Sequence, residues 1–223
     1  MNMMKYMEVP LLYQIINFGG CMIKFIDKNN TYIEENVQIG DNTVIYPNVV
    51  IEGTTIIGDN CTIYPGTVIK DSIIGNDCNI YSSYIFNSQI GNENHIGPFA
   101  NIRENNYICN NTKIGAFVEL KNANIGNDSY IPHLSYLGDT SIGNKVNIGC
   151  GVITANFDGK NKNRTIIEDN CFVGCNSTLV APIKINKNSF IAAGSTITED
   201  TEENSLAIAR SRQTNKPNRN PLN

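Results

Sequence analysis

An aliphatic residue recurs about every six positions along most of this chain of 223 residues. A six-residue period fits neither the 3.6-residue turn of an α-helix nor the two-residue alternation of a half-buried strand. It is typical of short strands joined by tight turns, and the frequent Gly, Asn and Asp residues supply turns because they tolerate positive φ. A short fixed period defines a whole architecture, so it outweighs any local helix or strand signal. The regular part of the repeat runs through Ile33, Ile39, Ile45, Ile51, Ile57, Ile63 and Ile69.

Three repeats make one coil of about 18 residues, and successive coils stack at the strand spacing of ~4.8 Å. The inward aliphatic side chains then form one buried column, which no single repeat could bury alone. Cys61, Cys78 and Cys171 each follow a repeat position by four residues, in a slot that elsewhere holds Thr or Val. We expect these three thiols to be small inward fillers. The sequence therefore predicts an all-β coil of hexapeptide repeats.

We expect three segments along the chain. Residues 1–25 form an N-terminal leader of unknown role, which we interpret as a short docking helix or strand because Glu8 interrupts its apolar patch and no cleavage site follows. Residues 26–200 form the coil, with a loop at 155–165 ejected from the repeat. Residues 201–223 form an irregular basic arm that carries Arg210, Arg212, Lys216 and Arg219.

Composition excludes several classes of protein. The net charge of −4 and the pI near 5.2 argue against a general nucleic-acid binder. Seven cysteines without a C-x-x-C pair fit reduced thiols better than a disulfide scaffold or a zinc module. No apolar run is long enough to cross a bilayer. We therefore expect a cytoplasmic protein with no nucleic-acid or membrane partner.

Two cations fall in one slot of the repeat. Arg103 and Lys121 each follow a repeat residue by one position and are 18 residues apart, so they should lie on successive coils. Like charges opposed across neighbouring strands are destabilising. The pair therefore either splays into solvent or holds an anion.

A second column begins at a histidine. His133 lies two positions after a repeat residue, and the same slot on later coils holds Cys150, Cys175 and Ala193, provided that 155–165 is ejected. Small side chains along one edge leave room for a long, thin ligand with its reactive end near the histidine and its phosphates near the basic arm. Acetyl-coenzyme A has this shape. Alternatively, small residues are simply common at coil corners.

At these positions the chain resembles a known family, the acetyltransferase domain of the bacterial bifunctional N-acetylglucosamine-1-phosphate uridyltransferase/glucosamine-1-phosphate acetyltransferase. The resemblance runs from about Ile26 to Thr214 and is densest from Ile96 onward. It implies a left-handed parallel β-helix, a handedness that the periodicity alone does not give. The matching segments include "IGPFANIRE", "IGAFVELKNANIG", "HLSYLGDTSIGNKVNIG", "TANFDGKNKNRTIIEDNCFVG" and "LAIARSRQT".

The resemblance also implies residue roles. His133 matches the general base, and an imidazole can accept a proton from a substrate ammonium near neutral pH. The backbone N–H of Cys150 is our candidate oxyanion donor. The remaining matches are sugar-phosphate ligands at Arg103, Lys121 and Lys162, sugar-ring contacts at Tyr136 and Asn147, an acetyl contact at Asn156, and a coenzyme A path along Cys150, Cys175, Ala193 and Arg210.

The activity implied is transfer of acetyl from acetyl-CoA to glucosamine-1-phosphate, in a homotrimer with intersubunit sites and with no metal. The product, N-acetylglucosamine-1-phosphate, would serve UDP-GlcNAc and cell-wall precursor synthesis. Cys150, Cys175 and Phe157 depart from the alanine, serine and tyrosine usual in the family. Residues 1–25 contain no Gly-rich nucleotide-binding loop, so we expect no uridyltransferase activity, and a separate uridyltransferase would supply that step.

Other functions are compatible with the fold. The substrate could be another amino-sugar 1-phosphate such as galactosamine-1-phosphate, because Arg and Lys recognise phosphate rather than a hydroxyl epimer. The chain could instead be a non-catalytic oligomerisation partner of a nucleotidyltransferase. A γ-class carbonic anhydrase needs three histidine ligands, and only His95 and His133 are present. We expect His95 to have no charged neighbour in register and no role in the chemistry.

Overall fold

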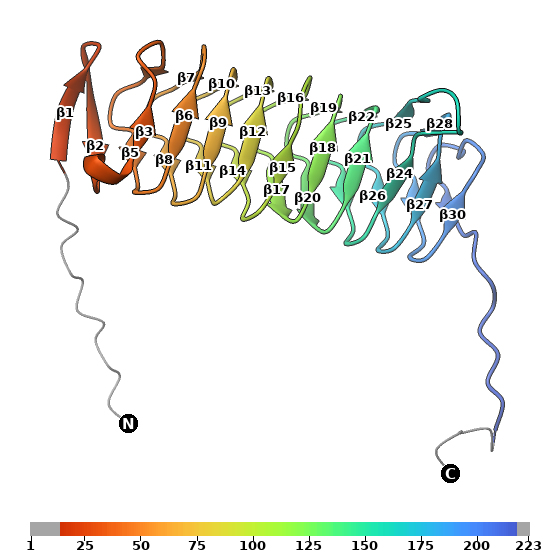
Figure 1. Ribbon diagram of the computed structural model, residues 1–223. Helices are drawn as coiled ribbons and strands as arrows, with labels where there is room; N and C mark the ends of the chain where they lie inside the picture. The colour runs from red at the N-terminus through yellow and green to blue at the C-terminus, as the bar shows by residue number, and fades with distance from the viewer. Residues whose placement is uncertain (1–13, 218–223) are drawn as a thin grey trace.

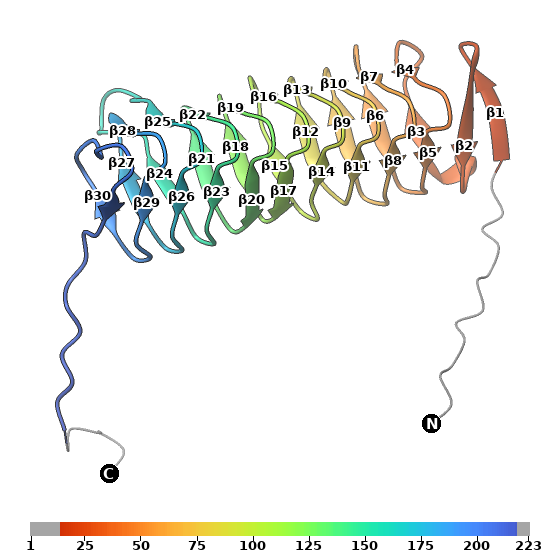
Figure 2. The same ribbon diagram turned by 180° about the vertical axis from the view of Figure 1, so that it is seen from behind.

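The computed structural model of the protein describes residues 14–217, in which the chain winds as a left-handed parallel β-helix along one axis (Figure 1). Each coil contributes one strand to each of three sheets, which we name A, B and C. Strands of successive coils pair in parallel, and the view from behind shows the same regular stacking from one end to the other (Figure 2). The fold class predicted from the six-residue period and the resemblance is confirmed.

The strands are short, most of them two or three residues long, and the single 3₁₀ turn in the described residues is η1 (Lys28–Asn30). Sheet A contains β1 (Gln14–Phe18), β2 (Cys21–Phe25), β5 (Val44–Ile45), β8 (Thr62–Ile63), β11 (Asn79–Ile80), β14 (His95–Ile96), β17 (Lys113–Ala116), β20 (Tyr130–His133), β23 (Asn147–Ile148), β26 (Phe172–Val173), β29 (Phe190–Ile191) and β31 (Leu206–Ala207). Sheet B contains β3 (Tyr32–Ile33), β6 (Val50–Glu52), β9 (Val68–Lys70), β12 (Tyr84–Phe86), β15 (Asn101–Ile102), β18 (Glu119–Lys121), β21 (Tyr136–Gly138), β24 (Ile153–Ala155), β27 (Thr178–Val180) and β30 (Thr196–Ile197). Sheet C contains β4 (Gln38–Ile39), β7 (Ile56–Ile57), β10 (Ile73–Ile74), β13 (Gln89–Ile90), β16 (Tyr107–Ile108), β19 (Asn124–Ile125), β22 (Thr140–Ile142), β25 (Thr165–Ile167) and β28 (Ile183–Ile185).

The core is the column of repeat side chains inside the three sheets. Repeat residues face each other in register on successive coils, as Ile51 does with Ile69, and both are fully buried. Burying each such side chain contributes about 1.5–3 kcal/mol. The three predicted filler thiols also lie inside, since Cys61, Cys78 and Cys171 are at most 1% exposed.

The corners explain why the repeat is rich in Asn and Asp. Corner residues adopt positive φ, for example Asn60, Asp77 and Asn111. A second device is a ladder at the corner between sheets C and A, where a side-chain oxygen accepts a hydrogen bond from the backbone N–H one coil earlier. It runs from Asp59 (2.7 Å from Asp41 N) through Asn76, Asn92, Asn110, Asn127 and Asn144 to Asp169. These exposed hydrogen bonds give partners to corner backbone donors and tie each coil to the next.

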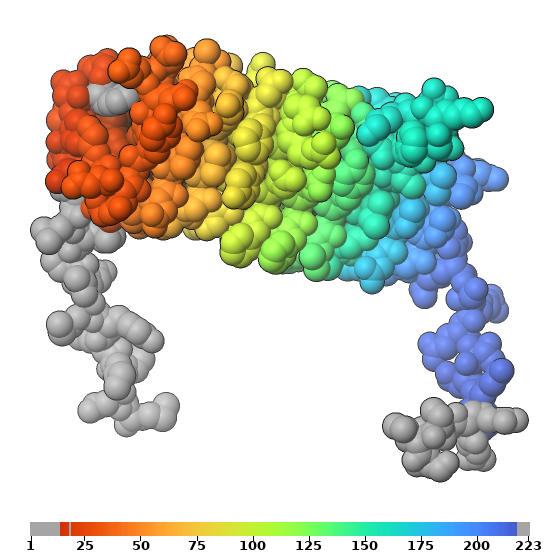
Figure 3. All heavy atoms as spheres, viewed as in Figure 1, coloured from red at the N-terminus to blue at the C-terminus, as the bar shows by residue number. Residues whose placement is uncertain are grey.

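The coils are not all of the expected 18 residues. Ile33 pairs with Ile51, a step of 18, but Ile69 pairs with Ile85, a step of 16. The difference lies at corners where consecutive repeat residues are five rather than six positions apart. A step of 25, from Ile153 to Thr178, contains the loop between β24 and β25. In Figure 3 this teal segment projects from the prism near its C-terminal end.

Both ends of the β-helix extend beyond the expected 26–200. Strand β2 pairs with β5, and its residues Ile23 and Phe25 belong to the buried core. Strand β1 pairs with β2 as an antiparallel hairpin, whereas residues 1–13 of the expected leader lie outside the described residues. At the other end β31 pairs with β29, so a last strand lies within the expected arm. Arg219 also lies outside the described residues.

Candidate functional site

Arg103 and Lys121 lie in the same slot on successive coils. Strand β15 pairs with β18 so that Ile102 faces Leu120, and the next residue on each strand is the cation. The two cations do not simply splay into solvent, because Glu104 lies 3.7 Å from Arg103 Nε and 3.4 Å from Lys121 Nζ. Arg103 Nη1 also donates to Glu119 Oε1 at 3.0 Å. Two carboxylates that the repeat pattern had not singled out therefore accompany the cation pair.

The charges in this cluster reinforce one another. The hydrogen bond that Arg103 donates to Glu119, with a smaller contribution from the charge of Glu104, raises the pKa of the Arg103 guanidinium. A hydrogen bond from its own backbone N–H, followed by the contacts with Lys121 and Arg103, lowers the pKa of the Glu104 carboxyl. The Glu104 carboxyl is thus held in its charged form, and the cluster pairs two cationic side chains with two acidic ones.

Polar side chains converge beside the cations over a glycine. Strand β21 places Gly138 in register with Lys121. A Cβ added to Gly138 would contact Tyr136 Oη and would lie 2.7 Å from Asn156 Nδ2. Any larger residue at this position would therefore displace these two side chains. Asp139 fixes the Asn156 amide by accepting a hydrogen bond from its Nδ2, and it accepts a second from Asn122 Nδ2 at 2.6 Å. Because two amides hold the Asp139 carboxylate, the Asn156 side chain is oriented before any ligand binds.

The histidine occupies an exposed corner between sheets A and B. His133 ends β20 and is in register with Ala116 on the preceding coil. On the following coils the same slot holds Cys150, Cys175 and Ala193, because Ile148 pairs with Val173 and Val173 with Ile191. The expected ladder of small residues is therefore continuous, and no bulky side chain of the ladder itself covers it.

Glycines next to this ladder allow successive coils to pack closely at the corner. A Cβ on Gly149 would lie 2.6 Å from the backbone N of Cys175, and a Cβ on Gly174 would lie 2.5 Å from the backbone N of Ala193. Larger residues would push the coils apart at these positions. At the far end the Arg210 side chain reaches over the same edge, since its Cδ lies 3.8 Å from a Cβ placed on Gly194.

One chain does not bring all the candidate residues together. His133 ends β20 and Gly138 ends β21, five residues later, which is up to roughly 16 Å at strand rise. Asn147 is in register with Tyr130 and Phe172 on sheet A, and Lys162 is exposed on the loop. The candidates therefore form separate groups on one chain.

The loop that carries Lys162 is held by its own contacts. Asp158 Oδ1 accepts hydrogen bonds from the backbone N–H groups of Lys160 and Asn161 at 2.8 Å and 2.7 Å, and these bonds lower the pKa of the Asp158 carboxyl. Arg164 fixes the loop base by donating from Nε and Nη2 to Ser141 Oγ at 3.0 Å and 2.8 Å. The sequence offered only the loop, not these two anchoring residues.

Three large apolar residues are exposed beside His133. Phe99, Phe117 and Leu134 occupy one column of the corner, are 56%, 60% and 58% exposed, and all have positive φ. The two phenyl rings stack with centroids 5.3 Å apart. Positive φ is costly for bulky side chains, and contiguous exposed apolar surface marks interaction sites. This column, which we call the apolar corner, is therefore a candidate surface for contact with another chain.

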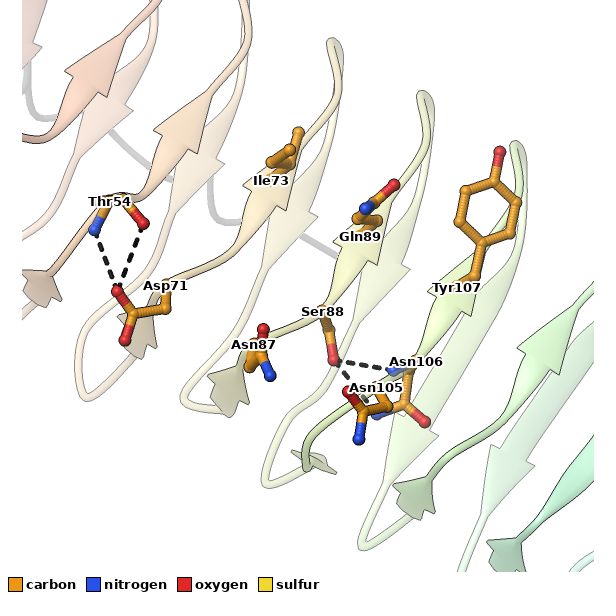
Figure 4. Close-up of a pocket in the computed structure, with 9 residues that line it drawn as sticks. All are labelled: Thr54, Asp71, Ile73, Asn87, Ser88, Gln89, Asn105, Asn106 and Tyr107. Atoms are coloured by element: carbon orange, nitrogen blue, oxygen red, sulfur yellow. Dashed lines mark hydrogen bonds between the residues drawn. The ribbon is translucent and has the colours of Figure 1, made fainter.

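A polar groove of about 420 Å³ lies elsewhere, at the corner between sheets B and C (Figure 4). It lies over the two five-residue corners, Ile69 to Ile74 and Ile85 to Ile90, between longer corners on either side. Shortened coils thus account for its shape, and it contains none of the candidate residues. Its lining residues are Thr54, Asp71, Ile73, Asn87, Ser88, Gln89, Asn105, Asn106 and Tyr107.

The second histidine differs from expectation in one respect. β14 pairs with β17 so that His95 faces Lys113, and the expectation of no charged neighbour in register was wrong. Within residues 14–217 no three His, Cys, Asp or Glu side chains are grouped so as to hold a metal ion. The same part of the chain has no helix long and apolar enough to span a membrane.

Comparison with curated proteins gives high identity over most of the chain. It is 53% identical over 194 residues to the Bifunctional protein GlmU of Caldicellulosiruptor saccharolyticus, covering 87% of this chain and 42% of that protein. The protein of the same name from Carboxydothermus hydrogenoformans is 54% identical, with 87% and 44% covered. That of Caldanaerobacter subterraneus is 56% identical, with 87% and 42% covered. The chain thus spans less than half the length of these relatives.

Family models and solved structures agree with the fold. A family model described as the GMPPB C-terminal domain matches residues 26–105, and one described as a hexapeptide repeat of succinyl-transferase matches residues 164–199. The Arabidopsis UDP-N-acetylglucosamine acyltransferase structure aligns with a TM-score of 0.59 at 19% identity, covering 80% of this chain and 63% of that one. The enzyme of the same name from Campylobacter jejuni gives 0.56 at 22% identity, with 81% and 70% covered. At these identities the two structures support the fold alone.

Proposed function

We propose that this chain, a hexapeptide-repeat homologue of part of the Bifunctional protein GlmU, is an acetyl-CoA-dependent glucosamine-1-phosphate N-acetyltransferase. The observation that carries the proposal is the convergence of Lys121, Tyr136 and Asn156 around Gly138, beside Arg103. This arrangement offers cations for a phosphate and hydrogen-bonding groups for a sugar ring and an acetyl carbonyl. The 194 residues aligned with these relatives include these positions.

The chemistry begins with the imidazole of His133. It takes a proton from the substrate ammonium, and the free amine attacks the thioester carbonyl of acetyl-CoA. The backbone N–H of Cys150 stabilises the oxyanion of the tetrahedral intermediate. The C–S bond then breaks, the proton held by His133 neutralises the departing coenzyme A thiolate, and the second proton of the attacking amine is lost to solvent as the amide forms. An N-acetyl sugar phosphate and free coenzyme A result.

Binding is divided among the groups described above. The phosphate is held by Arg103, Lys121 and Lys162, which supply charge-assisted hydrogen bonds to its oxygens. Tyr136 and Asn147 hold the sugar ring. Asn156 orients the acetyl group. Coenzyme A extends along the ladder of Cys150, Cys175 and Ala193 toward Arg210, whose charge suits its phosphates.

The complete site forms between chains of a homotrimer. On one chain His133, Asn147 and Lys162 lie in separate groups, so a neighbouring chain must bring complementary residues to each. The apolar corner supports this assembly, because Phe117 and its neighbours would lose their exposed surface against another copy. A cytoplasmic location and a separate uridyltransferase for the next step belong to the same proposal.

The closest competitor is the same reaction on galactosamine-1-phosphate. Arg103 and Lys121 would hold its phosphate equally well, since they do not contact the hydroxyl that distinguishes the two sugars. Competition kinetics between the two sugar phosphates decide which is preferred, and we expect the gluco epimer to win.

The test is release of free thiol from acetyl-CoA by the purified full chain. We expect release with glucosamine-1-phosphate and none above background with acetyl-CoA alone. Glucosamine without phosphate is the matched control for the cation pair and should react far more slowly. A folded protein that releases no thiol with either sugar phosphate would overturn the proposal and favour a non-catalytic oligomerisation role.

A further inference from the structure

Glu104 contacts both cations of the proposed phosphate site at once. Its Oε2 lies 3.7 Å from Arg103 Nε and its Oε1 lies 3.4 Å from Lys121 Nζ. A substrate phosphate that engages both cations needs the same space and the same charge partners. We propose, on the basis of the proposed function, that Glu104 is an internal anion gate that occupies the cation pair and must swing away when the sugar phosphate binds.

The two carboxylates of the cluster differ in how firmly they are held. Glu119 lies within β18 and makes a 3.0 Å hydrogen bond to Arg103 alone. Glu104 follows β15 at the corner, its side chain is 42% exposed, and it makes longer contacts to two partners. Its backbone stays fixed, because its carbonyl accepts a hydrogen bond from Asn122 N at 3.1 Å. The Glu104 side chain can therefore leave while its backbone stays in place.

The charge of the Glu104 carboxylate should weaken the affinity of the cation pair for the substrate phosphate. The lowered pKa of Glu104 keeps it ionised throughout the neutral range, so it competes with phosphate at every pH used for assay. With the gate in place, the two positive charges are balanced by two negative ones. Once Glu104 leaves, the pair presents a net positive charge to the incoming dianion. Exposed ion pairs are weak, so removing the competitor should change affinity by about two- to fivefold.

The variant Glu104→Gln keeps the size of the side chain and removes its charge. We expect its KM for glucosamine-1-phosphate to fall about two- to fivefold at low salt, with no fall in kcat. The difference from wild type should shrink as ionic strength rises, because exposed charges are screened. A purely structural role for Glu104 would instead raise KM or lower kcat.

Glu52→Gln is the matched control. Glu52 pairs with Lys70 at 3.5 Å on the same edge of sheet B, three coils before Arg103, and its side chain is 31% exposed. The substitution removes the same charge without touching the cation pair. An equal fall of KM in this variant would show a general charge effect and overturn the gate.

Binding of inorganic phosphate separates the gate from the proposed reaction. Calorimetric titration should show tighter phosphate binding to Glu104→Gln than to wild type or Glu52→Gln, whatever the chain catalyses. An active wild type with an unchanged or raised KM in Glu104→Gln overturns the gate and leaves the reaction standing. Absence of turnover together with tighter phosphate binding overturns the reaction and supports the gate.

Discussion

The first coils and the later coils differ most at the corner between sheets A and B. In the first coils the position after the repeat isoleucine holds Tyr46, Tyr64 and Tyr81, whose rings stack at centroid distances of 5.0 Å and 4.1 Å. We call these three residues the tyrosine column. In the later coils the same position holds mainly small residues, namely Gly97, Gly115, Pro132, Gly149, Gly174 and Ala192.

The inward pattern does not change between the two regions. Ile63 in the first and Ile148 in the second are both fully buried in the same sheet. Only the outward residues differ: in the first region stacked tyrosine rings follow the repeat residue, whereas in the second that position holds small residues on the coils around His133. The fold is thus a common scaffold, and the chemistry depends on which corner positions are emptied and which carry polar groups.

The largest expected effect tests whether catalysis depends on His133, which lies at the corner between sheets A and B in the later coils. His133→Ala should lower kcat by about 10²- to 10⁴-fold, the usual contribution of general-base catalysis, because His133 is the proposed base. The protein should stay folded because the His133 side chain is exposed. Thiol release and circular dichroism measure the two quantities.

The control for that variant is the second histidine, on the same sheet but two coils before His133. His95→Ala removes an exposed histidine there and should leave kcat unchanged. Equal losses in the two variants would show that the loss does not depend on the place of His133 at the start of the small-residue ladder.

The next effect concerns the buried core of repeat side chains, which the two regions share. Ile85→Ala and Leu120→Ala each truncate a fully buried side chain of sheet B, one in each region. Each should lower the free energy of unfolding by about 2–5 kcal/mol through lost burial and the cavity left behind. Denaturant unfolding measures both. A much smaller loss in one variant would show that the core is not uniform along the axis.

A smaller effect concerns the cation pair. Lys121→Ala removes a charged hydrogen-bond donor of about 1.5–3 kcal/mol, so KM for the sugar phosphate should rise roughly 10- to 150-fold. Lys70 lies on the same edge of sheet B in the first coils and pairs with Glu52. Lys70→Ala should leave KM near its wild-type value. A comparable rise in both would mean that the whole edge, and not the pair, attracts the phosphate.

These contrasts also show what the sequence could predict. The six-residue period predicts the inward column, and counting three repeats per coil places Arg103 beside Lys121 and His133 below Cys150. Such predictions succeed because a coil converts spacing along the chain directly into neighbours in space. The loop also follows from the interrupted count.

Side-chain partners were not predictable in the same way. Glu104 and Glu119 reach the cations through rotamers that the period does not determine, and Asp139 orients Asn156 from the preceding coil. His95, by contrast, faces Lys113 across a coil of the expected 18 residues, so the count itself predicts this charged neighbour and the expectation of none was wrong. The assembly of separate groups into one site depends on a second chain, which no count within one chain reveals.

The smallest expected effect is a loss of stability at high pH that arises in the tyrosine column. Desolvation, followed by hydrogen bonding and charge repulsion from Tyr81, raises the pKa of Tyr64 to about 12 from the usual 10. Because the folded protein disfavours the phenolate, neutral Tyr64 contributes stability that is complete below pH 10 and is lost as the pH rises to about 12. Phenolate absorbance should therefore show a late titration step.

That late step should vanish in Tyr64→Phe, and the variant should lose less stability than wild type between pH 10 and 12. Tyr107→Phe removes an exposed ring outside the column and should leave the step in place. The later coils have no stacked tyrosines at this corner, so the step reports on the first coils alone. If the late step survived in Tyr64→Phe, the column would not be the desolvated environment that distinguishes the first region from the second.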